Sequence, residues 1–284
     1  ESPTFGGSSW LAHSSLLAGV EVRDPQTYQL LLTQQCDTLP DRFARQGYRS
    51  LALMPGLRYA WPEGAFYGFE KIYDARALAY QGPEFGWWRI PDQYAVARFD
   101  QLEVATAPRQ PLFVFYPTIS SHLPFRPTPP YQADWARMLA QQPFEPGTLA
   151  ASLARTPYWT NLRPAYTDAL NYSFTWLAGY LEQHATADLV MIVLGDHQPP
   201  ASVSGADAPW QVPVHVITHR AEILAPLQAA GLQPGLKPGR PALGGMHELT
   251  ALLLRAFDSA PVSSRQTSGR SGSTRLPPGA DLPG

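Results

Sequence analysis

Four short apolar runs, separated by helix-like segments, constrain the fold of this chain more than any other feature. Strands that are apolar on both faces lie buried in a sheet, and strands that alternate with helices usually form a parallel sheet. We therefore predict an α/β domain with a mostly parallel central sheet and helices on both faces. The runs are YRSLALMP (48–55), PLFVFYPTIS (111–120), DLVMIVLGDH (188–197) and VPVHVITH (212–219).

Between these runs, apolar residues recur every three or four positions, as on the buried side of a helix. We expect helices over the segment that ends at Gly19 and over 37–46, 94–104, 165–183, 221–230 and 248–257. Residues 56–92 are loop-like, and the proline-rich stretch 123–164 is left unassigned. Residues 1–257 are expected to form one domain, and residues 258–284 hold almost no core-forming side chains and are expected to be disordered.

Charge, cysteine content and apolar run length argue against a nucleic acid partner, an internal disulfide and a transmembrane segment. The 21 Lys and Arg residues and 23 Asp and Glu residues give a net charge of -2, and the basic residues are scattered, which argues against a nucleic acid partner. The single cysteine, Cys36, cannot form an internal disulfide. The longest aliphatic run is LVMIVL at 189–194, far short of the roughly 20 residues that span a bilayer, so we expect no transmembrane segment in this chain.

Polar residues that could carry chemistry follow two of the apolar runs. Asp196 and His197 come directly after the third run, at the sheet edge where ligands collect, and a carboxylate with an imidazole suits a divalent cation such as Zn²⁺ or Mn²⁺. The alternative is that Asp196 begins a turn and His197 is a solvated loop residue. His122 follows the second run and could donate to a phosphoryl or sulfuryl oxygen, or simply bond to the backbone of its own loop.

The segment SPTFGGSSWLAHSSLLAGV (2–20) places two serines at the start of a short apolar helix, after a Gly-Gly pair. The unpaired N–H groups at a helix start stabilise an anion, and a serine there that is bound to a metal would be a competent nucleophile. Serine is equally the common capping residue at such a place. The residues alone leave both roles open for Ser8 and Ser9.

Together these loops resemble those of the alkaline phosphatase superfamily. In its sulfatases and nucleotide pyrophosphatases, the nucleophile stands ten residues before the glycine of a segment similar to LLAG here. Counting back from Gly19 selects Ser9 and leaves Ser8 as a secondary candidate. A sulfatase signature would place proline and arginine where this chain has Leu11 and His13, which disfavours an ordinary sulfatase and leaves His13 as another secondary candidate.

A closer resemblance is to the lipoteichoic acid synthase group of phosphoglycerol transferases. It implies that His122 contacts the substrate phosphate, that Trp61 lines the substrate site, and that Ser9 joins Asp196 and His197 as a metal ligand. The phosphate-binding arginine of that group is replaced by Glu63, so that Arg58 is the candidate substitute. The matching segments are AWPEGAFYGFEKIYDA (60–75), TISSHLPF (118–125), YTDALNYSF (166–174), GDHQPP (195–200) and VPVHVI (212–217).

Two further residues are secondary candidates. His247 precedes the last expected helix, where many members of the superfamily carry an acidic residue or a histidine near the site. Asp168 stands near the start of a long expected helix, where a carboxylate also simply favours the helix dipole.

The resemblance implies a metal-dependent phosphotransferase or phosphodiesterase that forms a phosphoseryl intermediate on Ser9. Its expected substrates are the phosphoglycerol- or phosphoalcohol-type groups of a phosphorylated lipid or glycan. Mn²⁺ or Zn²⁺ is the expected cofactor, with Mg²⁺ and Ca²⁺ as the other candidates. The alternatives are a sulfate-ester hydrolase of the same superfamily and a non-catalytic domain that binds phosphorylated glycans or lipid headgroups.

The resemblance also implies a segment that this chain does not contain. Members of the superfamily begin their sheet with a strand that ends in an acidic metal ligand, well before the nucleophile, and Glu1 is too close to Ser9 for that role. We therefore expect a missing first strand and a membrane anchor upstream. The chain would then be the extracytoplasmic part, periplasmic or cell-surface, of a bacterial inner-membrane protein.

Overall fold

The computed structural model describes residues 1–86, 90–106 and 109–258, so the tail expected to be disordered lies outside the described residues except for Asp258. The chain contains a 3-10 helix, η1 (Pro62–Tyr67), and a π-helical turn, η2 (Asp100–Val104), besides the strands and α-helices. The strands are β1 (Arg49–Leu53), β2 (Lys71–Tyr73), β3 (Leu112–Phe115), β4 (Val190–Leu194) and β5 (Val214–Thr218). The α-helices are α1 (Ser9–Ala18), α2 (Pro25–Leu32), α3 (Leu39–Arg45), α4 (Ala75–Leu78), α5 (Asp92–Phe99), α6 (Trp135–Met138), α7 (Pro146–Leu153), α8 (Arg163–Gln183), α9 (Ala201–Ser204), α10 (Ala221–Ala229) and α11 (Met246–Asp258).

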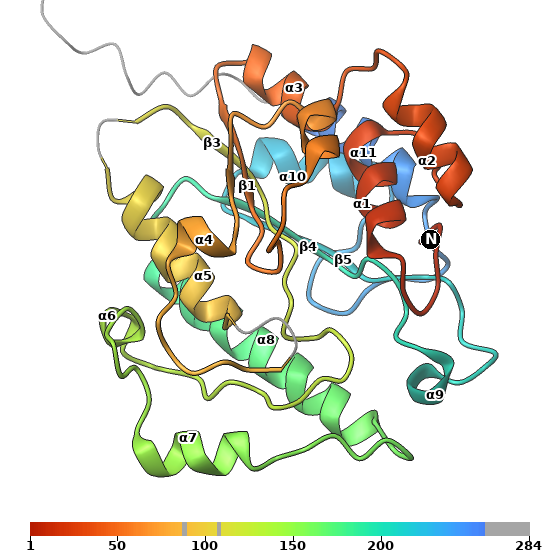
Figure 1. Ribbon diagram of the computed structural model, residues 1–284. Helices are drawn as coiled ribbons and strands as arrows, with labels where there is room; N and C mark the ends of the chain where they lie inside the picture. The colour runs from red at the N-terminus through yellow and green to blue at the C-terminus, as the bar shows by residue number, and fades with distance from the viewer. Residues whose placement is uncertain (87–89, 107–108, 259–284) are drawn as a thin grey trace, which may run out of the picture.

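The strands form two ladders between layers of helices (Figure 1). β1 lies between β2 and β3 and runs parallel to both, with Leu51 opposite Lys71 on one side and Val114 on the other. β4 and β5 pair antiparallel, with Ile192 opposite Val216. Helices α4, α5 and α8 lie on one side of the strands, and α1, α3, α10 and α11 lie on the other. The predicted α/β architecture is confirmed, and the parallel arrangement belongs to β1, β2 and β3.

Local sequence explains where several elements begin and end. The side chain of Thr38 accepts the N–H of Asp41 while the Asp41 carboxylate accepts the N–H of Thr38, a reciprocal cap that starts α3. Asp24 caps α2 by accepting the N–H of Thr27, and Pro25 occupies the first turn, where no N–H is needed. Helix α1 ends at Gly19, whose φ of 67° lies in the left-handed region that glycine tolerates.

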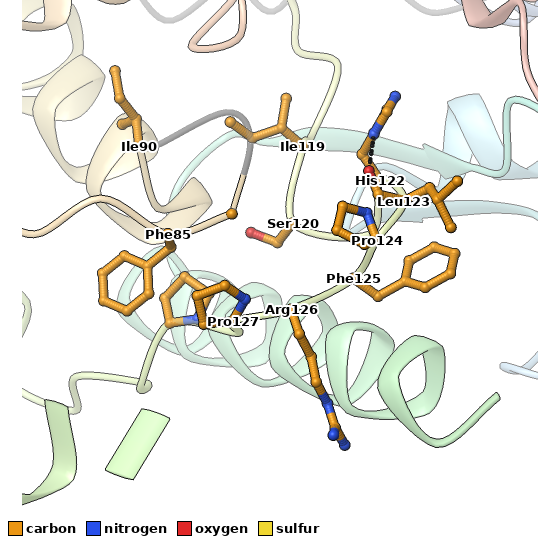
Figure 2. A pocket seen from close by; sticks show the side chains of 12 residues that line it. Phe85, Ile90, Ile119, Ser120, His122, Leu123, Pro124, Phe125, Arg126 and Pro127 are labelled. Carbon is orange, nitrogen blue, oxygen red and sulfur yellow. Dashed lines mark hydrogen bonds between the residues drawn. The ribbon is translucent and has the colours of Figure 1, made fainter. Parts of the chain in front are cut away.

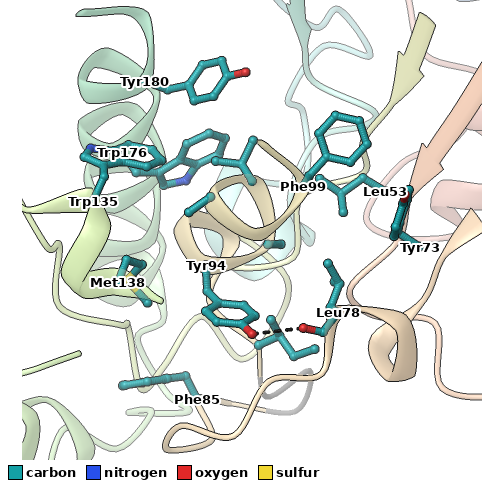
Figure 3. Close-up of a cluster of buried hydrophobic side chains, with 14 of the residues drawn as sticks. Leu53, Tyr73, Leu78, Phe85, Tyr94, Phe99, Trp135, Met138, Trp176 and Tyr180 are labelled. Atoms are coloured by element: carbon teal, nitrogen blue, oxygen red, sulfur yellow. Dashed lines mark hydrogen bonds between the residues drawn. The ribbon is translucent and has the colours of Figure 1, made fainter. Parts of the chain in front are cut away.

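The largest cluster of buried apolar side chains lies between the parallel strands and helices α5 and α8 (Figure 3). Leu53 of β1 and Leu78 of α4 are fully buried in it, and Trp176 and Tyr180 bring in the face of α8. This core fixes α5 and α8 against the strands whose following loops carry the candidate site residues.

Some expectations about elements were wrong. Residues 56–92 are more than a loop, because they contain η1, β2 and α4. β2 has only three residues, one of them buried, and its pairing with β1 rather than its own pattern makes it a strand. The helix expected over 94–104 begins at Asp92 and becomes π-helical at Asp100. Among the described residues, no helix combines the length and the apolar character needed to cross a bilayer.

Candidate active site

The opening segment and the loop after β4 lie side by side, joined by hydrogen bonds that do not involve the candidate catalytic side chains. Ser2 Oγ donates to the carbonyl oxygen of Asp196 at 2.6 Å. The N–H of Gly6 donates to the carbonyl oxygen of Gln198 at 3.0 Å. Gly6 has a φ of 72°, in the left-handed region that glycine tolerates, and a Cβ added to it would contact Pro200. The segment that starts α1 is thereby held against the Asp196–His197 loop.

Ser9 is the first residue of α1, and its hydroxyl faces the imidazole of His197. The distance from Ser9 Oγ to His197 Nε2 is 2.9 Å. Ser8 occupies the N-cap position with a φ of 59°, and its side chain makes no capping hydrogen bond. Capping is therefore not the role of the Ser8 hydroxyl, and Ser9 is the serine that reaches the Asp196–His197 loop.

The neighbours of His197 select its tautomer. Its Nδ1 lies 2.7 Å from the carbonyl oxygen of Gln198, which can only accept, so Nδ1 carries the proton. In the neutral ring, Nε2 would then accept from the Ser9 hydroxyl, whereas Asp196 Oδ2, 3.4 Å from Nε2, can only accept and favours a proton there. A metal-binding histidine needs the same arrangement, with one nitrogen donating to a carbonyl and the other free.

Asp196 organises the two histidines around it. Its Oδ1 accepts the backbone N–H of His197 at 2.9 Å. Its Oδ2 lies 3.4 Å from His197 Nε2 and 3.8 Å from His13 Nε2. Burial lowers the pKa of His13; the charge of Asp196 opposes this effect and His197 adds to it. His13, a secondary candidate, is therefore brought into the same cluster as a neutral ring.

The donor set can be compared with the needs of a divalent cation. Within the described part of the chain, no group of three or more His, Cys, Asp or Glu side chains is arranged to hold a metal ion. Asp196 and His197 supply two donors of the right kind, and the Ser9 oxygen is a third next to His197 Nε2. These residues fit part of the coordination shell of Mn²⁺ or Zn²⁺.

A row of aromatic rings connects Trp61 to His13. We call Trp61, Tyr67, Phe69, Phe115 and His13 the aromatic row. Successive ring centroids along it are 5.5, 6.3, 6.1 and 5.4 Å apart. The row runs from the segment before η1, past the end of β3, to the helix that carries Ser9.

His122 lies in the loop after β3 and is exposed. Its Nδ1 is 2.6 Å from the carbonyl oxygen of Leu123, so the ring bonds to its own loop, the alternative considered above. The same loop packs against α8, where the rings of Phe125 and Tyr166 are 5.2 Å apart. Burial, together with the charge of Asp196, raises the pKa of Tyr166. A small cavity lined by Ser120, His122 and Arg126 lies beside His122 (Figure 2).

The remaining candidates have other surroundings. Arg58 follows β1, is half-buried, and makes no hydrogen bond or ion pair with the residues that the structure describes. The ring of His247, at the start of α11, lies next to Gly245, where an added Cβ would be 2.7 Å from His247 Cε1. Asp168 is the sixth residue of α8, and its Oδ2 accepts from Arg126 and Arg155, each at 2.6 Å, so its carboxylate serves an ion-pair cluster.

Two contributors were missed from the sequence. Ser2 holds the Asp196 loop through its hydroxyl, and nothing in the sequence distinguishes it from other serines. Tyr166 stands close enough to Asp196 to be affected by its charge. It belongs to the YTDALNYSF segment, which was matched as a motif without a role for this residue.

Comparisons with known proteins concern the family and the fold of this chain. A family model described as Sulfatase matches residues 15–220, a range that includes His122, Asp196 and His197 but starts after Ser9. No curated protein matches the sequence. A protein of the alkaline phosphatase superfamily from Vibrio parahaemolyticus matches with a TM-score of 0.56 at 17% identity, covering 90% of this chain and 56% of that one. The lipoteichoic acid synthase LtaP from Listeria monocytogenes matches with a TM-score of 0.53 at 16% identity, covering 75% of this chain and 54% of that one. The chain thus spans about half the length of these structures.

Proposed function

The chain belongs to the sulfatase family of the alkaline phosphatase superfamily, and from this premise we propose that it is a metal-dependent phosphotransferase or phosphodiesterase with Ser9 as its nucleophile. The observation that carries the proposal is the 2.9 Å contact between Ser9 Oγ and Nε2 of His197, beside Asp196. A serine hydroxyl at a helix start, beside an imidazole and a carboxylate that can share a divalent cation with it, suits nucleophilic catalysis.

In the proposed reaction, Ser9 gives up its hydroxyl proton to solvent, Oγ attacks phosphorus, and the bond from phosphorus to the leaving oxygen breaks. The leaving oxygen takes up a proton from solvent and departs as an alcohol, which leaves a phosphoseryl group. Water or an acceptor hydroxyl then attacks this group and releases Ser9. A divalent cation, Mn²⁺ or Zn²⁺, held by Asp196, His197 and Ser9 would lower the pKa of the serine hydroxyl and offset the negative charge of the phosphoryl oxygens. The first N–H groups of α1 stabilise the same charge.

Substrate contacts are proposed for three residues. His122 and Arg58 are cationic or donating groups suited to a phosphate oxygen, and Trp61 at the end of the aromatic row offers an apolar wall. The proposed substrate is a phosphoglycerol- or phosphoalcohol-type group of a lipid or glycan. This substrate class is supported by the resemblance of the sequence to lipoteichoic acid synthases, as is the proposal that residues 1–257 form an extracytoplasmic domain of a membrane-anchored bacterial protein.

The proposal is tested with bis-p-nitrophenyl phosphate in the presence of Mn²⁺ or Zn²⁺. Ser9→Ala should lower turnover at least about 1,000-fold, because it removes the nucleophile, and should weaken but not abolish metal binding measured by calorimetry, because Asp196 and His197 remain as ligands. Ser8→Ala separates the two serines, since the Ser8 side chain makes no capping hydrogen bond. Full activity of Ser9→Ala, or loss of activity in Ser8→Ala alone, would contradict the assignment.

The family match supports a second candidate, hydrolysis of sulfate esters by the same nucleophile. Leu11 and His13 stand where sulfatases carry proline and arginine, which favours the phosphodiester. Parallel assays with p-nitrophenyl sulfate and with the phosphodiester distinguish the two. If the protein binds a phosphorylated headgroup but turns over neither ester, it is a binding domain.

A further inference from the structure

Asp92 is a fully buried carboxylate that the proposed reaction does not use. It is the first residue of α5, and three donors from one loop converge on it. Its Oδ1 accepts the N–H of Ile119 at 2.9 Å and the hydroxyl of Tyr116 at 3.1 Å, while its Oδ2 accepts the N–H of Ser120 at 2.9 Å. A buried carboxylate is tolerated only when such donors satisfy it, so the arrangement binds this loop strongly to α5.

Gln93, the next residue, holds the other end of the same loop. It is also fully buried, and its side chain makes two hydrogen bonds to the backbone of Gln132: Nε2 donates to the carbonyl oxygen at 2.6 Å, and Oε1 accepts the N–H at 3.0 Å. The backbone N–H of Gln93 in turn donates to the hydroxyl of Tyr172 on α8, at 3.3 Å. Two consecutive residues therefore fix both ends of the segment 116–132.

His122 lies within this segment, two hydrogen bonds from Asp92. The N–H of Ile119 donates to Asp92, and the carbonyl oxygen of Ile119 accepts the N–H of His122 at 3.0 Å. In the turn 119–122, Ile119 is therefore bonded to the buried carboxylate of Asp92, and His122 is bonded to Ile119. Figure 2 shows Ile119, Ser120 and His122 following one another along this turn.

We propose that Asp92 is a positioning residue, which fixes the turn 119–122 and so sets where His122 meets the substrate, while Gln93 anchors the far end of the loop. The inference rests on the proposed function, in which His122 contacts the transferred group. Burial raises the pKa of Asp92 and the N–H groups of the turn oppose this effect, which is consistent with a carboxylate held for its acceptor geometry.

The kinetic test compares Asp92→Asn, His122→Ala and the double variant on bis-p-nitrophenyl phosphate. Asparagine has the same shape but only one acceptor oxygen, and its amide group cannot accept the second backbone N–H. Asp92→Asn should lower kcat/KM about 10- to 100-fold, the value of one or two charge-assisted hydrogen bonds. Because it acts through His122, the double variant should be no more than about twofold worse than His122→Ala.

Glu103→Gln is the matched control. Glu103 is another buried carboxylate, but it bonds to Arg49 at the start of β1 and to Tyr73 of β2, neither of which belongs to the segment 116–132. The Glu103→Gln variant should have a lower free energy of unfolding but keep kcat/KM within about twofold, since Arg49 and Tyr73 are not part of the segment 116–132. If Asp92→Asn does not fold, Tyr116→Phe removes one of the three donors and should lower kcat/KM about 3- to 10-fold, again without adding to His122→Ala.

A second readout does not depend on turnover. In Asp92→Asn, the amide protons of Ile119 and Ser120 should exchange with solvent faster and the ring resonances of His122 should shift, and Glu103→Gln should change neither. The inference is overturned if the amide protons of Ile119 and Ser120 exchange at the wild-type rate in Asp92→Asn. It is also overturned if the double variant loses kcat/KM by the product of the factors lost in Asp92→Asn and in His122→Ala. If the wild type hydrolyses no phosphodiester, the proposed function fails, and the exchange and the His122 resonances still decide whether Asp92 positions the turn.

Discussion

Gly68 occupies a position where an added methyl group would have two separate costs. Its φ of 73° lies in the left-handed region, which costs an alanine about 1–2 kcal/mol. A Cβ at this position would also lie 1.9 Å from Asp41 Oδ1, so the Asp41 carboxylate must move. That carboxylate is half of the reciprocal cap with Thr38, and losing such a cap costs about 0.5–2 kcal/mol. We expect Gly68→Ala to lower the free energy of unfolding by about 1.5–4 kcal/mol.

Gly47→Ala is the control that isolates the first cost. Gly47 has a φ of 85°, and no atom lies within 4 Å of its added Cβ, so only the backbone penalty of about 1–2 kcal/mol applies. Urea denaturation of both variants and the wild type measures the difference. If the two alanine variants lose the same stability, Asp41 has not been displaced and the reasoning is refuted.

Two further predictions concern buried hydrogen bonds. The Ser14 hydroxyl donates to the carbonyl oxygen of Trp10, so the Tyr67 hydroxyl donates to Ser14; Tyr67→Phe should cost about 1 kcal/mol, whereas Ser14→Ala leaves a buried donor without this partner and should cost more, about 1–3 kcal/mol. Equal losses in chemical denaturation would contradict this donor assignment. Burial alone would raise the pKa of Glu103, but hydrogen bonds led by that from Arg49 outweigh it and lower the pKa below 4.5. The stabilisation is therefore present above pH 4.5 and is lost as the pH falls through the lowered pKa, so that between pH 6 and pH 3 the wild type should lose more unfolding free energy than Glu103→Gln. Equal losses would show that the ion pair does not lower this pKa.

Sequence was sufficient where one segment determines its own structure. β4 is apolar throughout and β1 ends in the apolar residues 51–53, and polar Asp196 and His197 follow the end of β4. The resemblance selected Ser9 by its spacing from Gly19, and the Ser9 hydroxyl lies 2.9 Å from His197 Nε2, while its role as the nucleophile stays a prediction. In each case the information lies within a few neighbouring residues.

Sequence was insufficient where a distant partner decides the structure. The short strand β2 depends on its pairing with β1, and the direction of β5 depends on its pairing with β4. Asp92 looks like an ordinary residue at a helix start, and only the loop 27 residues later makes it the acceptor for Ile119. Such long-range hydrogen bonds have no local pattern from which they could be predicted.

The same long-range bonds determine how the variants of the site can be interpreted. The start of α1 is joined to the loop after β4 by Ser2 and Gly6, independently of the Ser9 and His197 side chains. Ser9→Ala and His197→Ala therefore remove the 2.9 Å contact while these two bonds still hold the segments together. Loss of turnover in either variant, with unfolding free energy unchanged, consequently reports on the chemistry of the pair. A parallel loss of stability would instead show that the side-chain contact is needed to assemble the site.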